Sequence, residues 1–309
     1  MIVLPTVAVM LSCYNGEKYI EEQILSIMNQ EKVEIHLFVR DDGSTDNTIK
    51  IVENIKKQYQ DRIKIFCEDN IGIGNSFWKL LFLAGQGYDY YSFSDQDDLW
   101  HCDKLFQAIK KLKEESCHMY FSNQFLIDME GKKLGRAYLT IPNYSFYSTL
   151  FANYVRGCTL VFDRYIWNLI TEEGREPDRI ILNSRNHDFW IACVGGMLNT
   201  LVYDEKCTMD YRQHQGNAVG AYECSLLRNL YHKIAKIRYF ERLRLRSKSA
   251  ASLLHCYPEY LNKDIFIELL THQKSLLNRI KLIKFCIKSD LYGKQKKIAF
   301  ILYTILGLV

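Results

Sequence analysis

Apolar runs of strand length alternate with amphipathic stretches through the first 100 residues of the chain. The runs have the length and composition of buried strands, and they occupy residues 6–12, 34–39, 62–67 and 90–94. Between them, apolar side chains recur at helical spacing over residues 17–29, 46–59 and 74–84. This alternation predicts an α/β fold, in which a mostly parallel sheet is flanked by helices on both faces.

Polar clusters follow three of the four predicted strands. They are Ser12-Cys13-Tyr14-Asn15, Asp41-Asp42-Gly43-Ser44 and Asp95-Gln96-Asp97-Asp98. Because the carboxyl ends of parallel strands lie along one edge of a sheet, we expect the three clusters to meet at that edge. This is the edge at which such sheets bind their ligands.

Three carboxylates stand within four residues directly after the apolar run at residues 90–94. An unpaired charge is costly to bury, so carboxylates at this position need a reason. In an extended segment Asp95 and Asp97 point the same way, and two converging carboxylates suit a divalent cation that is shared with phosphate groups. The sequence leaves a second interpretation open, in which Asp97 or Asp98 caps the helix that begins near Asp103.

The middle of the chain, residues 101–224, has a less regular pattern. The residues with the character of strands are 119–127, 155–162 and 200–204, and residues 189–194 have that of a helix. Asp188 stands immediately before this helix, where it suits either a catalytic carboxylate or an N-cap. Residues 210–220 are predicted to form a polar loop.

The charge of the chain is distributed unevenly. Of its 309 residues 40 are basic and 36 acidic, but residues 225–309 hold 17 basic against 5 acidic side chains, a net charge of +12. The first 224 residues therefore hold 23 basic and 31 acidic side chains, a net charge of −8. We expect a basic, helical C-terminal region that either contacts an anionic surface or presents a solvated face with no partner.

The chain ends in an apolar segment, residues 298–309, that follows three lysines. Twelve residues make about 18 Å of helix, which is too short for a hydrocarbon core of about 30 Å. The segment suits either an anchor in the membrane interface or a helix docked on the domain. No secretory signal and no CxxC pair are present, and we expect the ten cysteines to be reduced thiols of a cytoplasmic protein.

The polar clusters, taken in order, resemble the motifs of family 2 glycosyltransferases. Residues 12–16 are similar to the opening motif of the family and residues 41–46 to the second. Residues 95–98 are similar to its DxD motif, and the longer stretch at residues 94–100 resembles the rhamnosyltransferase-like branch. The resemblance implies a GT-A type, Rossmann-like fold over residues 1–224. Its first 100 residues would bind a nucleotide sugar and the others the acceptor.

The resemblance implies a nucleoside-diphosphate sugar as the donor, either dTDP-rhamnose or a UDP-sugar, and an inverting transfer supported by Mg²⁺ or Mn²⁺. It places Asp42 against the pyrimidine base, with Ser12, Tyr14 and Asn15 close by, and Asp95 against the ribose. Without the resemblance, the cluster around Asp42 is an ordinary turn and Tyr14 a packing residue.

The same resemblance assigns the metal, the diphosphate and the catalytic base. Asp97 and His214 would bind the metal ion, and Arg212 would contact the diphosphate. Asp188 matches the carboxylate that accepts the proton of the attacking hydroxyl.

The acceptor would contact two neighbours of the base. His187 would either hydrogen-bond the acceptor sugar or orient Asp188, and Trp190 would either contact that sugar or pack in the core. The QxxRW motif and membrane helices of processive members are absent from the sequence, so we expect the addition of one or a few sugars.

Three further interpretations compete with a glycosyltransferase. A non-catalytic subunit that binds a nucleotide sugar or glycan would be expected to have lost part of the site. A nucleotidyltransferase of similar fold would need a glycine-rich basic loop, which residues 12–16 lack. Nucleic-acid binding by the basic tail is not expected. We expect as partners a sugar donor, a glycan acceptor on a lipid carrier, and the inner face of the bacterial cell membrane, where the protein would be peripheral.

Overall fold

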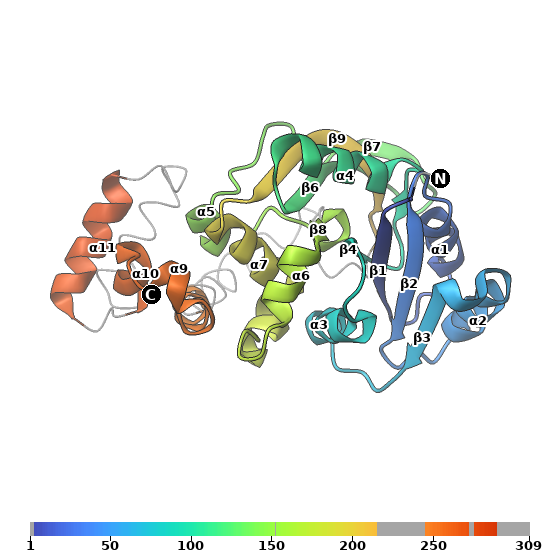
Figure 1. The fold of residues 1–309 in the computed structure, drawn as a ribbon, viewed down its shortest axis with the longest axis horizontal. Coiled ribbons are helices and arrows are strands. Elements are labelled where there is room, and N and C mark those ends of the chain that lie inside the picture. Colours follow the sequence, from blue (N-terminus) through green and yellow to red (C-terminus); the bar gives the residue numbers. More distant parts are fainter. Residues whose placement is uncertain (1–2, 152, 215–244, 272–274, 289–309) are drawn as a thin grey trace, which may run out of the picture.

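The computed structural model describes residues 3–151, 153–214, 245–271 and 275–288. The predicted helical spacing in residues 227–240 and the apolar segment at residues 298–309 lie outside these residues. The domain boundary predicted at residue 224 and most of the polar loop predicted at residues 210–220 also lie outside them. Figure 1 shows the described elements, with a central sheet that extends through most of the molecule.

The sheet begins with four parallel strands in the order β3-β2-β1-β4. Their bounds are Thr6–Cys13 for β1, Glu34–Asp41 for β2, Ile63–Cys67 for β3 and Tyr90–Ser94 for β4. The parallel half agrees closely with the prediction. Beyond β4 the sheet becomes mixed and continues as β8-β6-β9-β5, with β7 paired to β6. The bounds there are Leu99–Trp100 for β5, Met119–Ile127 for β6, Lys133–Arg136 for β7, Val161–Asp163 for β8 and Leu201–Arg212 for β9.

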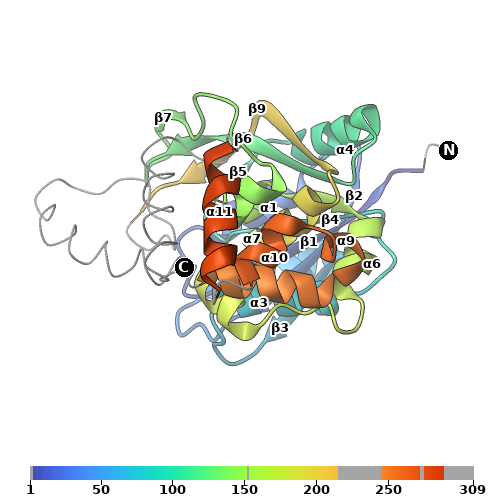
Figure 2. The same cartoon turned by 90° about the vertical axis from the view of Figure 1, so that its left-hand side faces the viewer.

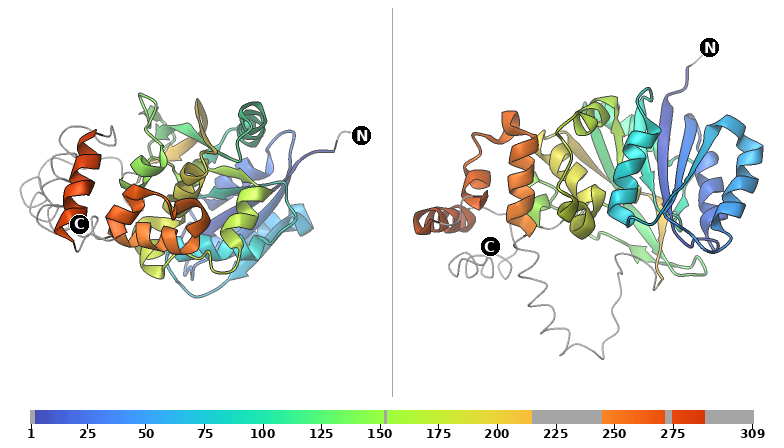
Figure 3. Two further views of the ribbon diagram at one scale, coloured as in Figure 1. Left: turned by 60° about the vertical axis from the view of Figure 1, so that its left-hand side comes forward. Right: turned by 90° about the horizontal axis from the view of Figure 1, so that it is seen from below.

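Helices cover both faces of this sheet, as predicted. On one face lie α1 (Ile20–Met28), α2 (Thr48–Tyr59) and α4 (Lys104–Glu115), and on the other α3 (Ile73–Ala84), α5 (Phe146–Phe151), α6 (Arg164–Thr171) and α7 (Arg179–Met197). Figure 3 shows α3, α6 and α7 side by side along their face. A hydrophobic core lies on each face of the sheet, and alternate residues of β1 belong to the two cores. Ala8 and Met10 face the second set of helices, while Val7 and Val9 face the first.

The described part of the C-terminal region is helical, as predicted. Residues 245–256 form a helix that is followed by α9 (Pro258–Leu261), α10 (Ile265–Thr271) and α11 (Leu276–Lys288). Their buried side chains belong to the same core cluster as those of α7, and they include Leu253, Tyr257, Phe266 and Leu282. In Figure 2 these helices lie in front of the sheet. Among the described residues no helix is long and apolar enough to cross a bilayer.

Three predicted elements in the middle of the chain have the wrong bounds. Residues 157–159 form the short helix η2 (Gly157–Thr159), and only the end of the predicted strand at 155–162 pairs, as β8 with β4. The helix predicted from residue 189 begins at Arg179, where the Asp178 side chain caps it by accepting from the Ile180 N–H. Asp188 therefore lies inside α7, which rules out its role as an N-cap. The strand predicted at 200–204 is longer, because β9 pairs with β6 as far as Arg212.

The carboxylates at 97 and 98 also do not cap a helix. Strand β5 follows them directly, and α4 begins only at Lys104, with Asp103 at its N-cap position. The capping alternative for Asp97 and Asp98 is therefore wrong. These residues form the turn between β4 and β5 at the edge of the sheet.

Candidate active site

A cavity of about 340 Å³ opens beyond the carboxyl ends of β1 and β4, between the polar clusters predicted to meet there. Cavities of this size are typical of small-molecule sites. Its lining includes these side chains that the sequence predicted for a site: Ser12, Tyr14, Asp42, Asp95, Asp97, His187 and Asp188. The cavity is thus formed by both halves of the sheet domain. The three polar clusters lie on one side of it, and α7 and η2 lie on the other.

Asp42 is held on its side of the cavity by a buried ion pair. Its Oδ1 lies 2.5 Å from an Nη of Arg40, which is fully buried, and both carboxylate oxygens accept backbone N–H groups, from Ile71 and Gly72. The same Arg40 also donates to Ser76, whose hydroxyl is 2.6 Å from that of Ser12. This network fixes the carboxylate and the hydroxyl at the ends of β2 and β1.

The first and third clusters are joined by two hydrogen bonds. The Gln96 amide accepts from the Tyr14 N–H at 2.9 Å and donates to the Tyr14 carbonyl at 3.1 Å. The backbone of Tyr14 is thereby fixed, while its ring is half exposed along the cavity. The Oδ1 of Asn15 accepts from the Thr45 N–H at 2.8 Å. Asn15 therefore joins the first two clusters and does not line the cavity, which differs from the donor contact expected for it.

Carboxylates crowd together at the start of the third cluster. Burial, together with the charges of Asp97 and Asp188, raises the pKa of Asp95 to about 7. Asp98 is 1% exposed, and burial raises its pKa well above the usual range, as do its two acidic neighbours. Oxygens of Asp95 and Asp98 lie within 4.8 Å of the Cys158 thiol. Negative charge is thus disfavoured here unless a cation is present.

The two side chains predicted to bind a metal ion lie in contact. Nε2 of His214, which follows β9, is 2.6 Å from Oδ2 of Asp97. Both side chains are mostly buried, and the His214 ring stacks on Tyr19. A carboxylate oxygen and an imidazole nitrogen are ligands that Mn²⁺ and Mg²⁺ sites use. Four carboxylates line the cavity against one arginine, Arg156, so the described residues also fit a divalent cation by their charge.

Asp188 faces these carboxylates from α7. Its oxygens accept from the Phe189 N–H at 2.6 Å and the Gly157 N–H at 3.3 Å, and burial raises its pKa to about 6. A carboxylate with this pKa is ionised at neutral pH and accepts a proton more readily than an exposed one. A side chain at Gly157 would come within 2.8 Å of Nε2 of His187, so only glycine lets η2 approach α7 this closely.

His187 lines the cavity but is 4% exposed. Its ring packs against Phe77 and Phe93, with centroids 4.2 and 4.4 Å away, and burial lowers its pKa to about 3. Neither ring nitrogen has a hydrogen-bond partner within the described residues. His187 is therefore neutral and retains an unused donor and an unused acceptor beside the cavity.

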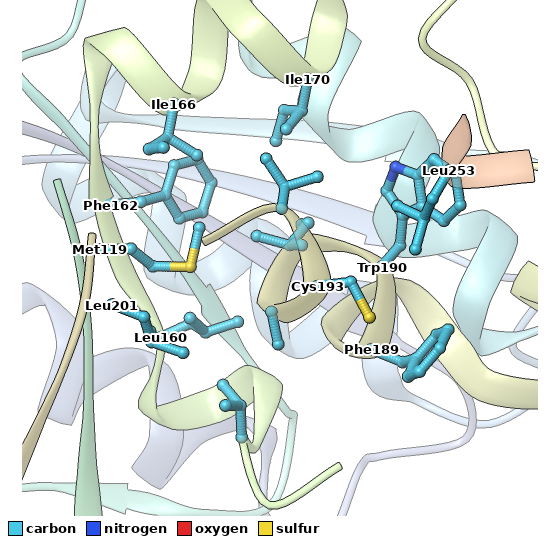
Figure 4. Packing of buried hydrophobic residues seen from close by; sticks show 14 of the residues in the cluster. Met119, Leu160, Phe162, Ile166, Ile170, Phe189, Trp190, Cys193, Leu201 and Leu253 are labelled. Carbon is cyan, nitrogen blue, oxygen red and sulfur yellow. The ribbon is translucent and has the colours of Figure 1, made fainter. Parts of the chain in front are cut away.

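Trp190 does not reach the cavity. It is fully buried in the core, with its ring 6.1 Å from that of Tyr257. Figure 4 shows the ring beside Leu253, on the side of α7 that packs against the C-terminal helices. Of the two roles considered for Trp190, packing in the core is the one observed, and acceptor binding is wrong for this structure.

Arg212 is also placed differently from the prediction. It is 4% exposed, and its guanidinium donates to the carbonyls of Asp97 and Met129 and forms a 2.8 Å ion pair with Glu22. The contact with the Asp97 carbonyl supports the backbone of that residue. Arg212 is not among the residues that line the cavity, and its contact with a diphosphate stays a prediction.

Sequence reasoning missed two functional candidates. Arg156 is the cationic side chain among the described residues that line the cavity, and it faces Asp95 and Asp188 closely enough to lower the pKa of each. The prediction of a strand at residues 155–162 gave no reason to place Arg156 in a site. The Gly157 that follows it did indicate that the backbone comes close to another group there. Gln96 was quoted within a motif but given no role, and it fixes the backbone of Tyr14.

Comparisons with known proteins agree with this geometry. The family model described as "Glycosyl transferase family 2" matches residues 8–167. The dTDP-rhamnosyl transferase RfbG of Shigella flexneri is 35% identical over 224 residues, which cover 68% of this chain and 74% of that protein. A GalNAc(5)-diNAcBac-PP-undecaprenol beta-1,3-glucosyltransferase of Campylobacter jejuni is 30% identical over 128 residues, 41% of this chain and 40% of that protein.

A solved structure shares the fold. The structure of S. aureus TarS residues 1–349 in complex with UDP-GlcNAc superposes with a TM-score of 0.59 over 98% of this chain and 81% of that chain, at 18% identity. At this identity the likeness concerns the fold, which is of the GT-A type. The matches to the family model and to RfbG are more specific, because they extend over half and two thirds of the sequence. The chain belongs to glycosyltransferase family 2.

Proposed function

We propose that this protein transfers a single sugar from a nucleoside-diphosphate sugar to a glycan acceptor, with inversion at the anomeric carbon and with the help of Mg²⁺ or Mn²⁺. The observation that carries the proposal is the placement of two groups on one cavity. Asp97, which contacts His214, and Asp188, whose pKa is about 6, both line this cavity. We propose the diphosphate at the first and the acceptor hydroxyl at the second.

Two side chains of α7, Asp188 and His187, have tasks in this reaction. Asp188 accepts the proton of the acceptor hydroxyl as its oxygen attacks the anomeric carbon. His187 offers its unpartnered ring nitrogens to the acceptor beside the base. Attack from the side opposite to the leaving group inverts the configuration in one step. When it is bound, the metal ion supplies positive charge for the nucleoside diphosphate that leaves.

The donor would lie along the ends of β1, β2 and β4. We place the pyrimidine base between Tyr14 and Asp42, beside Ser12, and the ribose near Asp95. The similarity to RfbG, which is named a dTDP-rhamnosyl transferase, supports a thymidine donor, and a UDP-sugar fits the same side chains. We assign to Arg156, the arginine that lines the cavity, the contact with the diphosphate that was expected for Arg212.

The acceptor is proposed to be a growing cell-surface polysaccharide on a lipid carrier. One relative is named for an acceptor linked to undecaprenol through a diphosphate, which supports this choice. A lipid-linked acceptor lies at the inner face of the bacterial membrane, so we propose that the protein works there as a peripheral protein. With neither a spanning helix among the described residues nor the QxxRW motif, the proposal is for non-processive transfer.

Thermal unfolding with nucleotides tests the proposal. The purified chain is heated with UDP, dTDP, GDP or CDP, each with Mn²⁺ or with EDTA, because a ligand that binds only the folded state raises the midpoint. We expect a rise with one pyrimidine diphosphate in Mn²⁺ that EDTA and Asp97→Asn remove. Absence of any rise would contradict the proposal.

A non-catalytic subunit that binds a nucleotide sugar or glycan is the second candidate. The subunit and the transferase are distinguished by measuring whether nucleoside diphosphate is released from the donor when an acceptor is present. A protein that binds the nucleotide but releases none with any glycan acceptor is the binding subunit. Turnover that disappears in Asp188→Asn is the transferase.

A further inference from the structure

Helix α11 has two faces that differ in their surroundings. Its inner face is attached to the rest of the protein: Leu282 is fully buried, and the Phe285 ring lies 4.9 Å from that of Phe266 in α10 and 6.1 Å from that of Tyr147 in α5. The helix is therefore fixed in position by aromatic contacts, and its other face is presented in a defined direction.

The outer face of α11 combines aliphatic side chains with lysines. Leu277, Ile280 and Ile287 are 60%, 42% and 56% exposed, and Lys281 and Lys284 between them are exposed as well. The spacing of these residues, at i, i+3, i+4, i+7 and i+10, places them along one side of a helix. Large aliphatic side chains in water are unfavourable, so their alignment on one face indicates a partner.

Charge indicates what that partner is. The 13 residues of α11 include the basic side chains Arg279, Lys281, Lys284 and Lys288 and no acidic one. A surface with negative charge and an apolar layer beneath it complements both kinds of side chain on the outer face. An anionic phospholipid bilayer has this structure, because headgroups attract the ammonium groups while aliphatic side chains enter the boundary of the acyl chains.

We propose that the outer face of α11 docks the enzyme on an anionic phospholipid membrane. This proposal rests on the proposed function, because an acceptor linked to a lipid requires the enzyme to work at the membrane surface. It adds the part of the protein that makes the contact. The helix lies flat with its axis along the interface, while its inner face keeps the sheet domain attached. Figure 1 places α11 at the end of the molecule farthest from β3 and α2, and in Figure 2 it stands in front of the other described helices.

Two other occupants fit the face less well. A second copy of the chain would bring two α11 helices together, and their like charges would repel across the interface. Single-stranded nucleic acid is bound through aromatic side chains on which bases stack, and the exposed apolar side chains on this face are aliphatic. Both alternatives remain outcomes of the experiment below.

Vesicle co-sedimentation tests the proposal with the full chain. The vesicles contain phosphatidylcholine alone or a mixture with phosphatidylglycerol, at low and at raised salt. We expect binding to the anionic vesicles only, and weaker binding at raised salt. The double variant Lys281→Gln/Lys284→Gln should weaken binding by roughly 25-fold, since each lysine near an anionic surface is worth about a factor of five. Ile280→Glu/Ile287→Glu should weaken it at least as much.

Matched controls alter the same kinds of side chain elsewhere. Lys50→Gln/Lys57→Gln removes two exposed lysines from α2, and Phe82→Glu changes a half-exposed aromatic residue on α3. Both should leave vesicle binding unchanged. Nucleotide-induced thermal shifts should be equal in all variants, so a failure of membrane docking is distinguished from a failure of the proposed donor site.

Three results would overturn the proposal. Wild-type protein that binds neither kind of vesicle would exclude a membrane as the partner. Vesicle binding that is equally strong in the α11 variants and in the controls would place the contact elsewhere on the chain. A wild-type dimer that Ile280→Glu/Ile287→Glu converts to a monomer would identify the face as an interface between copies.

Discussion

Nε2 of His214 lies 2.6 Å from Oδ2 of Asp97, although the two residues are 117 positions apart in the chain. The sheet brings them together, because β9 pairs with β5 as well as with β6, and β5 begins two residues after Asp97. The Arg212 guanidinium donates to the Asp97 carbonyl at 3.0 Å and adds a second connection between the segments. The metal site that we propose at this pair is thus connected to the end of β9.

Removing either member of the pair should therefore abolish metal-dependent nucleotide binding. In Asp97→Asn and in His214→Ala we expect the thermal shift produced by Mn²⁺ with the preferred nucleoside diphosphate to disappear. Asp61→Asn, a change of the same kind at an exposed carboxylate near β3, should keep the full shift. A full shift in both site variants would mean that the pair does not hold the metal ion.

The pKa of Asp188 predicts the pH profile of transfer. Burial raises this pKa to about 6, and a general base acts only when it is deprotonated. The rate at saturating substrates should therefore rise tenfold per pH unit below about pH 6 and level off above it. Asp188→Asn should lose transfer at every pH while it keeps the nucleotide-induced thermal shift. A profile that is flat from pH 5 to pH 8 would contradict the role of Asp188.

The sequence predicted which side chains at the ends of β1, β2 and β4 line the cavity, because local pattern determines their positions. Apolar runs that stop at polar clusters mark the ends of β1, β2 and β4, and parallel strands align those ends. Ser12, Tyr14 and Asp42 line the cavity for this reason.

The acceptor side was harder to predict because tertiary packing determines it. Trp190 follows Asp188 by two residues, but a helix turns by about 100° per residue, and helix α7 extends well before Asp188. Trp190 thus faces the core while Asp188 faces the cavity. Arg212 was misplaced because its contacts with Glu22 and Met129 join segments that are distant in the chain.

Lys104 should destabilise the folded protein at neutral pH. It is fully buried at the start of α4, its Nζ lies 3.9 Å from the Trp100 ring centroid without a hydrogen-bond partner among the described residues, and burial lowers its pKa to about 8. The unfolded chain holds the proton more tightly, so stability increases with pH between about 8 and 10.5. Lys104→Met should raise the free energy of unfolding at pH 7 by about 2–3 kcal/mol, because the buried charge is gone.

Urea unfolding at pH 7 and at pH 9 checks this expectation. The wild type should gain stability at the higher pH relative to Lys104→Met, and the gap between the two proteins should narrow. Lys110→Met, on the exposed face of the same helix, should alter neither value by more than about 0.5 kcal/mol. A Lys104→Met protein that is less stable at pH 7 would show that the ammonium group makes a favourable contact that outweighs its burial.

Arg156 and Arg212 should respond oppositely to the same substitution. Arg156 lines the cavity, so Arg156→Ala should weaken nucleoside-diphosphate binding by at least tenfold and change the free energy of unfolding little. Arg212 is buried and donates to two carbonyls and to Glu22, so Arg212→Ala should lower the free energy of unfolding by about 2 kcal/mol, because it removes three part-buried hydrogen bonds. Urea unfolding and nucleotide titration of both variants separate the two effects. If Arg212→Ala retains its stability and loses the nucleotide, the assignments of the two arginines are reversed, and Arg212 must turn toward the cavity when the donor binds.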